Sequence, residues 1–522
     1  MDESLIELLR ADLKAAGYSA GAVETLLGPA ADGARQRGVF APARRVLAAR
    51  EGSALATLVR VFLLGESAAA EEIEAALPEL GAAGAAGLGL VDSDTGEGSG
   101  AGAFRAALSL NPVRIADAVA TEPQEWIVLS DLDDQLRRGP ARPDHVMGVG
   151  GATRSLIAQA PAGAVARGLD LGTGCGIVAM HLALRGPVVA TDISERALRI
   201  ARANARLNGV GGLIEFRRGD LFAPVAGESF DLVLSNPPFV ITPRGSDAPI
   251  YEYRDGGLVG DELAARVVSG APGLLSPGGQ LVCLANWESP WGANGLERVR
   301  GWVDAAARTA GPVSAWVIER DRLSPEQYAE TWARDGGARP GDAEYERLME
   351  AWLDDFAARR IVSIGLGAVR VRREGPDAPG GGRADALVHV DQAEGRYADE
   401  GLGSLMQHAF AAGVTAARMS DAAVLAAHWA VDPAVVEERI HRPGEEAPTA
   451  ITLITDRPIA RRVTADTLLA AAVGACDGEL SLGQIADALA TILEVDAGAA
   501  AEALVAGARE LAWLGMLAPA DR

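Results

Sequence analysis

The chain has 522 residues, of which 49% are hydrophobic and 23% are charged, and its formal net charge is −23. This length predicts about two to four domains, and the composition is that of a globular protein with a sizeable core. The negative charge argues against a general nucleic-acid-binding protein, which needs a basic face to neutralise phosphates. A local basic patch is still compatible with it.

The cysteines and the apolar runs indicate the compartment. Cys175, Cys283 and Cys476 are far apart and show no CxxC spacing, so neither a disulfide framework nor a metal site is predicted. The acidic N-terminus does not look like a signal peptide. No apolar run reaches the roughly 18 residues that a membrane-spanning helix needs. We therefore expect a cytoplasmic protein without a membrane partner.

Residues 1–110 are expected to form an N-terminal helical, winged-helix-like module, with helices followed by two short strands around a Gly/Ser-rich tip. Such a module can bind DNA or RNA, or it can pack against a partner. Its second helix carries Glu71, Glu72 and Glu74, where a groove-reading helix would need cations. The sequence therefore favours packing or partner docking.

Residues 111–160 are expected to form a connecting strand and a Gly-rich approach loop that leads into a helix. From 161 to 373 short apolar strands alternate with helical segments, which is typical of a mostly parallel α/β sheet. Residues 374–390 have the Pro/Gly composition of a linker. Residues 391–522 are expected to form an acidic C-terminal helical, winged-helix-like module for protein contact or internal packing.

The stretch "DLGTGCG" places Asp170 two residues before the first of three alternating glycines, between a strand and a helix. Such a turn lets the backbone approach a ligand closely. Dinucleotide sites use a different glycine spacing, G-x-G-x-x-G. An acidic residue here would repel a pyrophosphate and suits a cationic ligand.

The next three strands end in polar residues. "VVATDIS" ends at Asp192, which suits a ribose diol, and "LIEFRRGDLF" ends at Asp220, which could accept a hydrogen bond from an adenine amino group. "FDLVLSNPPFV" ends in the motif Asn236-Pro237-Pro238-Phe239. The alternative is a Gly-rich turn in another kind of nucleotide-binding domain.

These four segments, in this order, resemble a class I S-adenosylmethionine-dependent methyltransferase over about residues 165–375. The resemblance implies a Rossmann-like sheet that is mostly parallel with an antiparallel last strand, and it implies S-adenosyl-L-methionine as cofactor. The cofactor-binding residues that it implies are Asp170, Gly172, Thr173, Gly174, Gly176, Asp192, Ile193, Asp220, Leu221 and Asn236.

The Asn-Pro-Pro-Phe motif predicts transfer to a planar NH2 group. Asn236 supplies a side-chain carbonyl, Pro237 a preorganised backbone carbonyl, and Phe239 a flat face, while Pro238 stiffens the turn. In families with this motif the acceptor is a glutamine amide or an exocyclic base amine. The alternative is a strand-terminal turn without a catalytic role.

Two segments indicate different acceptors. "RDGG…GDEL" (254–263) resembles the HemK-type release-factor glutamine methyltransferases, whereas "GVGGATRSL" (148–156) looks more like ribosomal RNA guanine-N2 methyltransferases. We favour a protein or peptide glutamine-type amide, with RNA, less so DNA, as the alternative. A natural-product substrate and a non-catalytic cofactor-binding scaffold also stay open. An acidic or neutral rim around Asn236 would count against RNA.

A helical insertion at 323–360 is expected between the last strands. It lies where it could cover the substrate entrance. Its four large aromatic residues could line such a lid or form the insertion's own core, and we favour the core. These residues are Tyr328, Trp332, Tyr345 and Trp352.

Overall fold

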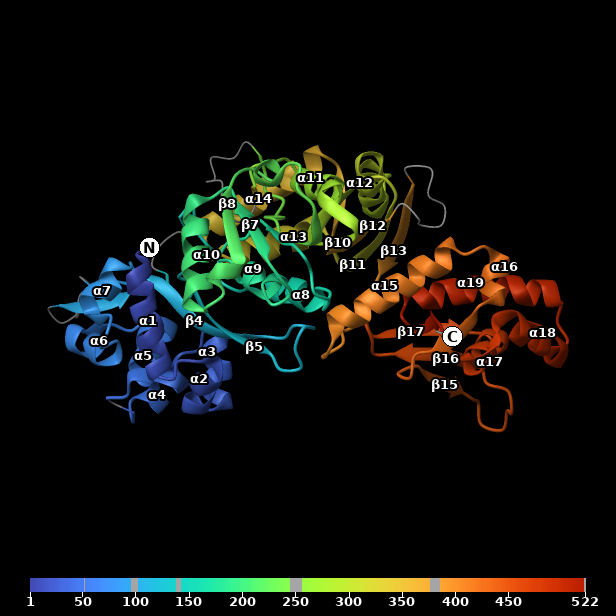
Figure 1. The fold of residues 1–522 in the computed structure, drawn as a ribbon, viewed down its shortest axis with the longest axis horizontal. Helices are drawn as coiled ribbons and strands as arrows, with labels where there is room; N and C mark the ends of the chain where they lie inside the picture. The colour runs from blue at the N-terminus through green and yellow to red at the C-terminus, as the bar shows by residue number, and fades with distance from the viewer. Residues whose placement is uncertain (51, 95–101, 138–141, 245–255, 376–384, 521–522) are drawn as a thin grey trace.

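The computed structural model describes residues 1–50, 52–94, 102–137, 142–244, 256–375 and 385–520. Its centre is an eight-stranded sheet with the strand order β13-β11-β12-β10-β9-β6-β7-β8 (Figure 1). The strands are β6 (Gly168–Leu171), β7 (Val188–Asp192), β8 (Ile214–Arg218), β9 (Phe230–Ser235), β10 (Leu275–Pro290), β11 (Val313–Leu323), β12 (Ile361–Arg373) and β13 (Ala386–Gln392).

The five strands from β8 to β10 run parallel, and β12 is antiparallel to both β10 and β11. A mostly parallel sheet with an antiparallel last strand is therefore confirmed for the predicted segment. The first strands are short apolar runs, and every residue of β6 is buried, because helices cover both faces of such a sheet.

Helices pack on both faces of the sheet. Leu232 and Leu234 of β9 contact the core beneath one set of helices, and Val233 between them contacts the core on the other face, as the alternation of a strand requires. The first set is α8 (Gly151–Gln159), α9 (Ile177–Leu182) and α10 (Glu195–Leu207). The second is α11 (Glu262–Gly270) and α12 (Gly295–Ala310), joined by the short helix η3 (Ala271–Leu274). Two further short helices are η1 (Gly211–Leu213) and η2 (Ala223–Val225).

The insertion forms α13 (Pro325–Asp335) and α14 (Ala343–Ala358), which pack against each other between β11 and β12. Tyr328, Tyr345 and Trp352 are buried in a core that also holds residues 240–241 just after the Asn-Pro-Pro-Phe motif. Trp332 is half-buried and packs against the same core. The insertion is thus joined to the end of the motif by apolar packing.

The N-terminal module is helical with one small sheet of order β1-β3-β2. Its elements are α1 (Glu3–Ala15), α2 (Ala20–Leu27), α3 (Pro29–Gln36), α4 (Ala41–Leu47), α5 (Ala54–Leu64), β1 (Ala68–Ala69), α6 (Ala70–Ala76), α7 (Gly81–Gly87), β2 (Val91–Ser93) and β3 (Ala103–Ala106). Most of the expected tip between β2 and β3, residues 95–101, lies outside the described residues. The winged-helix-like character stays a prediction.

The connection to the central domain differs from the expected boundary at residue 110. β4 (Leu108–Ile115) runs across it and pairs with β5 (Gln124–Asp131) in an antiparallel ribbon. Asn111-Pro112 looks like a strand break in the sequence. Proline is compatible with this strand because a two-stranded ribbon leaves one edge of each strand unpaired.

The C-terminal boundary also differs. The expected boundary between the linker (374–390) and the C-terminal module (from 391) lies inside β13. This strand pairs in parallel with β11 at the edge of the central sheet. The short apolar run of β13 follows a Pro/Gly-rich segment, of which residues 376–384 lie outside the described residues. That composition hides the strand in the sequence.

The C-terminal module contains two three-stranded sheets, β18-β14-β19 and β15-β16-β17, so it is less helical than expected. The N-cap of the helix that follows β17 is Asp466, whose carboxylate accepts from the Leu469 amide at 2.7 Å. The elements are α15 (Leu402–Arg418), α16 (Asp421–Ala426), β14 (His428–Val431), β15 (Val436–Ile440), β16 (Ala450–Thr455), β17 (Arg461–Ala465), α17 (Thr467–Gly474), β18 (Asp477–Ser481), α18 (Leu482–Leu493), α19 (Ala497–Trp513) and β19 (Leu517–Pro519).

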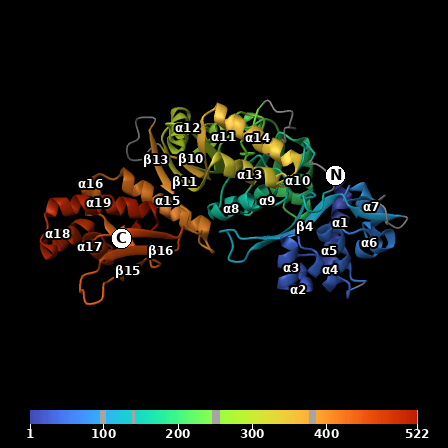
Figure 2. The same ribbon diagram turned by 180° about the vertical axis from the view of Figure 1, so that it is seen from behind.

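The two end modules lie on opposite sides of the central domain, with the N-terminal one in blue and the C-terminal one in orange to red (Figures 1 and 2). The N-terminal module contacts the central domain through α1, which packs on α10, where the Arg206 guanidinium pairs with Glu7 at 3.1 Å. The C-terminal module contacts it through α15, which packs on α8. Within the described residues, no helix is both long enough and apolar enough to cross a membrane.

Candidate active site

A cavity of about 450 Å³ opens at the carboxyl ends of β6, β7 and β9. Ligands bind at this edge in open α/β sheets, because the strand ends and the following loops meet there. Its walls come from the strand ends with their loops, the approach loop, the first turns of α8 and α9, residues of α10 and α11, and the insertion through Trp332 and Asp335.

The glycine turn after β6 forms one wall. The amides of Gly172 and Thr173 donate to the carbonyl of Thr191 on β7 at 3.0 and 2.8 Å. Gly172 and Gly174 have φ values of +82° and +54°, a left-handed conformation that favours glycine. A Cβ at either glycine would meet no atom within 4 Å, so the backbone there is open to a ligand.

Two residues of this motif do not line the cavity. Asp170 is buried behind the turn, where its carboxylate accepts from the Thr173 hydroxyl at 2.6 Å, and burial raises the pKa of Asp170 to about 7. Gly176 lies where a Cβ would come within 2.8 Å of the Ala201 Cβ, so it permits close packing of α9 on α10. Asp170 and Gly176 therefore shape the turn, and the other predicted cofactor residues line the cavity.

Asp192 at the end of β7 lines the cavity and also orders the turns around it. One carboxylate oxygen accepts from the Gly174 amide at 2.9 Å, and the other accepts from the Ser194 amide at 2.8 Å. The next residue, Ile193, is 57% exposed, an apolar side chain at the cavity wall. Asp220 and Leu221 follow β8 and line the cavity as well, with Asp220 exposed.

The two polar atoms of the Asn236 side chain have different surroundings. Its Nδ2 donates to Thr153 Oγ1 on α8 at 3.2 Å. Its Oδ1 is buried and accepts no hydrogen bond within the described part of the chain. A buried carbonyl without a donor is costly unless a ligand supplies one. Pro237, Pro238 and Phe239 line the same cavity.

The insertion completes the wall beside the motif. The Trp332 ring stands edge-on to Phe239, with centroids 6.2 Å apart and planes at 66°. Both backbone groups of Ile241 are bound by the insertion: its amide donates to Tyr328 Oη at 2.9 Å, and its carbonyl accepts from Trp352 Nε1 at 2.7 Å.

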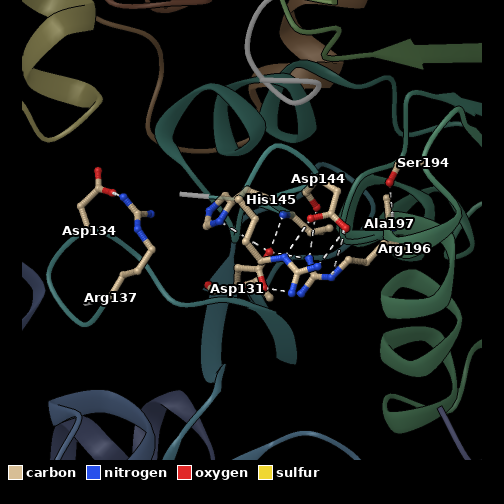
Figure 3. Close-up of polar contacts among 11 residues, drawn as sticks. Asp131, Asp134, Arg137, Asp144, His145, Ser194, Arg196 and Ala197 are labelled. Atoms are coloured by element: carbon tan, nitrogen blue, oxygen red, sulfur yellow. Dashed lines mark hydrogen bonds and ion pairs between the residues drawn. The ribbon is translucent and has the colours of Figure 1, made fainter. Parts of the chain in front are cut away.

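The approach loop is held by an ion-pair network that the sequence did not reveal (Figure 3). The Asp131 carboxylate at the end of β5 accepts from the Val146 amide at 2.7 Å and from two nitrogens of Arg196 on α10. Arg196 also donates to the Asp144 carbonyl at 3.2 Å. His145 lines the cavity 3.5 Å from Asp131, and burial lowers the pKa of His145.

The sequence predicts the Gly-rich approach loop as part of the site, but it does not reveal Thr153 and Arg196. Thr153 lies within "GVGGATRSL", which was the available signal. Arg196 follows Asp192 by four residues, but its partner Asp131 is 65 positions away, and nothing local indicates the pairing.

The described residues that line the cavity include no lysine or arginine. Its charged side chains are the carboxylates of Asp192, Asp220 and Asp335. The cavity wall is thus acidic to neutral.

Residues 147–312 match the family model described as methyltransferase small domain, and residues 15–103 match a domain of unknown function, DUF7059. The ribosomal protein uL3 glutamine methyltransferase of Bradyrhizobium diazoefficiens is 37% identical over 150 residues, which are 27% of this chain and 46% of that protein. The release factor glutamine methyltransferases of Xylella fastidiosa and Cereibacter sphaeroides are both 38% identical, over 146 and 181 residues. These matches cover 26% and 33% of this chain and 53% and 63% of the relatives. The chain thus spans about half the length of the curated relatives that it matches.

Two solved structures align with low scores. A geranyl diphosphate methyltransferase in complex with SAM is 14% identical, with a TM-score of 0.28, over 42% of this chain and 84% of that one. A methyltransferase from Pyrococcus furiosus is 16% identical, with a TM-score of 0.23, over 41% and 77%.

Proposed function

We propose that the protein is an S-adenosylmethionine-dependent N-methyltransferase that modifies a glutamine-type amide of a protein, and the match of residues 147–312 to the methyltransferase small domain supports this. The observation that carries this proposal is the buried, unpartnered Oδ1 of Asn236 at the cavity. Such an acceptor fits the hydrogens of an NH2 group.

The residues at the strand ends suit the cofactor. When bound, S-adenosylmethionine supplies an electrophilic methyl group on a positively charged sulfur. The open backbone at Gly172 and Gly174 would let it approach, Asp192 would accept from the ribose hydroxyls, and Ile193 would pack against the adenine.

The motif residues would bind and orient the acceptor nitrogen. Asn236 Oδ1 and the Pro237 carbonyl would each accept one hydrogen of the amide, which directs the nitrogen lone pair toward the cofactor side of the cavity. Phe239, which the Trp332 ring contacts edge-on, would offer a flat face against which the planar group packs. Positive charge that develops on the nitrogen is stabilised by these two carbonyls, and the proton can leave to water.

The acidic to neutral wall of the cavity favours a protein amide over an RNA base. RNA brings phosphates near the reacting base, and their binding relies on Lys and Arg, which are missing from the described wall. The relatives reported above are glutamine methyltransferases of a ribosomal protein and of release factors, which supports a protein acceptor. Such acceptors would place the reaction in the cytoplasm.

The direct test is transfer of labelled methyl from S-adenosylmethionine to fractions of a bacterial lysate, with and without ribonuclease. We expect label in protein that survives ribonuclease. Label that disappears with ribonuclease would overturn the protein acceptor and favour an RNA base.

The matched variants are Asn236→Ala and Asn111→Ala. Asn236→Ala removes the acceptor at the cavity and is expected to abolish transfer while cofactor binding stays nearly intact. Asn111 lies on β4 outside this cavity, so its variant is expected to transfer methyl like the wild type. Unchanged transfer by Asn236→Ala would contradict the role of the motif.

A further inference from the structure

An exposed apolar surface lies at the end of β10, on the same edge of the central sheet as the cavity. Trp291, which follows β10, is 70% exposed, and Val259 and Val362 are 52% and 44% exposed. We call these three residues the Trp291 surface. Single exposed apolar residues are common on proteins. A tryptophan is normally buried over most of its ring, however, and its exposure here calls for a partner.

The Trp291 surface is assembled from three parts of the central domain. The Trp291 amide donates to the carbonyl of Arg360, just after α14, at 2.8 Å. Val362 lies two residues after Arg360, at the start of β12. Val259 lies in the turn before α11, and Leu263, four residues later, lines the cavity. The Trp291 surface is therefore continuous with the cavity wall.

Buried ion pairs fix the backbone under this surface. Asp261, at the start of α11, accepts from the Glu288 amide of β10 at 3.0 Å and from two nitrogens of Arg298 at 2.7 Å. The Glu288 carboxylate pairs with Arg359 at the end of α14. Asp261 and Glu288 are both buried. The exposed side chains therefore stand on a rigid base, and little conformational entropy of the backbone is lost when a partner binds them.

The position of Trp291 along β10 determines how large the partner must be. Ser235, the residue before Asn236, pairs with Cys283 of β10, and Trp291 follows Cys283 by eight residues. At about 3.3 Å per residue, Trp291 lies roughly 25 Å along the strand from the motif. A molecule that contacts Trp291 while it reacts at Asn236 must be a polypeptide that extends well beyond the reacting side chain.

We propose that the Trp291 surface is a docking site for the protein acceptor, which contacts it through an apolar side chain while its glutamine occupies the cavity. This inference rests on the proposed function. Exposed tryptophans are favourable anchors for a protein partner. Three side chains offer too little area for a stable dimer of this chain, whereas an acceptor that is also bound in the cavity needs only an added contact.

The kinetics of methyl transfer to the protein that takes up label from the wild type test the docking site. At saturating cofactor, Trp291→Ala should raise the KM for this protein about tenfold, while kcat and cofactor affinity stay as in the wild type. Trp291→Phe keeps an apolar ring and should raise this KM only about two- to threefold. A five-residue peptide centred on the methylated glutamine reaches only about 7 Å to either side. Trp291→Ala and the wild type should therefore have the same kcat/KM for the peptide.

Ile492→Ala is the matched control, because Ile492 is 73% exposed on α18 of the C-terminal module. It should leave the KM for the protein acceptor unchanged. The urea midpoint of Trp291→Ala should equal that of the wild type, since an exposed ring contributes little packing to the fold.

An unchanged KM for the protein acceptor in Trp291→Ala would overturn the docking site. An equal loss of kcat/KM with the peptide would also overturn it, because the effect would then arise in the cavity. These outcomes leave the methylation itself intact. If the wild type labels no protein, the proposed function fails, and the docking site fails with it.

Discussion

Asp170 belongs to the predicted cofactor motif, but it does not line the cavity. It supports the glycine turn through a buried hydrogen bond. Its carboxylate is buried against the Thr173 hydroxyl, and burial, with a smaller contribution from the negative charge of Asp192, raises the pKa of Asp170 to about 7. The folded protein therefore holds a proton on Asp170 at pH values where the unfolded chain, with an ordinary pKa of 3.8, releases it.

This shift predicts a pH dependence of stability. The contribution of Asp170 is fully present below about pH 4 and is lost as pH rises to about 7, because unfolding releases a proton in that window. Asp170→Asn cannot titrate and still accepts from Thr173. The urea midpoint of the wild type relative to Asp170→Asn should therefore fall between these pH values and stay level above them. If the difference in urea midpoint between the wild type and Asp170→Asn does not vary with pH, the raised pKa of Asp170 is contradicted.

Asp192 is the strand-end carboxylate that we expect to bind the ribose. Asp192→Ala should weaken S-adenosylmethionine binding by roughly 1–3 kcal/mol, because both the ribose acceptor and the bond that orders Gly174 are lost. Titration calorimetry measures this directly. Asp220→Ala, at an exposed position, should cost less. If Asp192→Ala binds S-adenosylmethionine as tightly as the wild type, Asp192 does not bind the ribose.

At the scale of elements, the insertion forms part of the cavity wall. Tyr328 accepts from the amide of Ile241 and from Asn286 Nδ2, both at 2.9 Å, so a single buried hydroxyl joins α13 to the end of the motif and to β10. A helix pair held in this way positions the motif and is poorly suited to swing open as a lid.

Tyr328→Phe tests this role, because it leaves two buried donors without a partner. We expect a loss of about 1–3 kcal/mol in stability and a lower maximal transfer rate, with cofactor affinity unchanged. Tyr345→Phe is the matched control: Tyr345 is buried in the same insertion, and among the described residues its hydroxyl makes no hydrogen bond. If Tyr328→Phe and Tyr345→Phe have the same stability and the same transfer rate, the insertion does not position the motif.

At the scale of the whole molecule, a buried ion pair joins the ribbon of β4 and β5 to the central domain. Asp117, in the connection between the two strands, pairs with the Arg185 guanidinium and accepts from His181 Nδ1 at 2.9 Å. His181 Nε2 accepts from Trp126 of β5 at 2.8 Å. Burial is the main cause that lowers the pKa of His181, so the ring is neutral and serves both bonds.

Asp117→Ala should destabilise the protein by about 3–5 kcal/mol, because it leaves Arg185 buried without a counter-charge. Adding Arg185→Met should recover much of this loss, since the uncompensated cation is then removed. Denaturant unfolding of the two variants and the wild type gives the comparison. If the double variant is as unstable as Asp117→Ala, the unpaired charge of Arg185 is not the cause of the lost stability.

The central sheet and the strand-end part of the cavity wall could be predicted because each depends on a short run of residues: an apolar strand, its polar end and the turn after it. What the sequence did not reveal depends on partners far apart in the chain. Thr153 meets Asn236 across 83 positions, and Arg196 meets Asp131 across 65. Likewise, β13 pairs with β11 across 73 positions, Val313 with Ala386, and nothing local indicates that partner.

The most direct test of the proposed glutamine methylation is to identify the methylated atom. Protein labelled by the full chain with deuterated-methyl S-adenosylmethionine would be digested and sequenced by mass spectrometry, beside the Asn236→Ala variant. We expect the label on the side-chain nitrogen of a glutamine with the wild type and none with the variant. Label on a nucleic-acid base, on an oxygen atom, or equally with Asn236→Ala would contradict it.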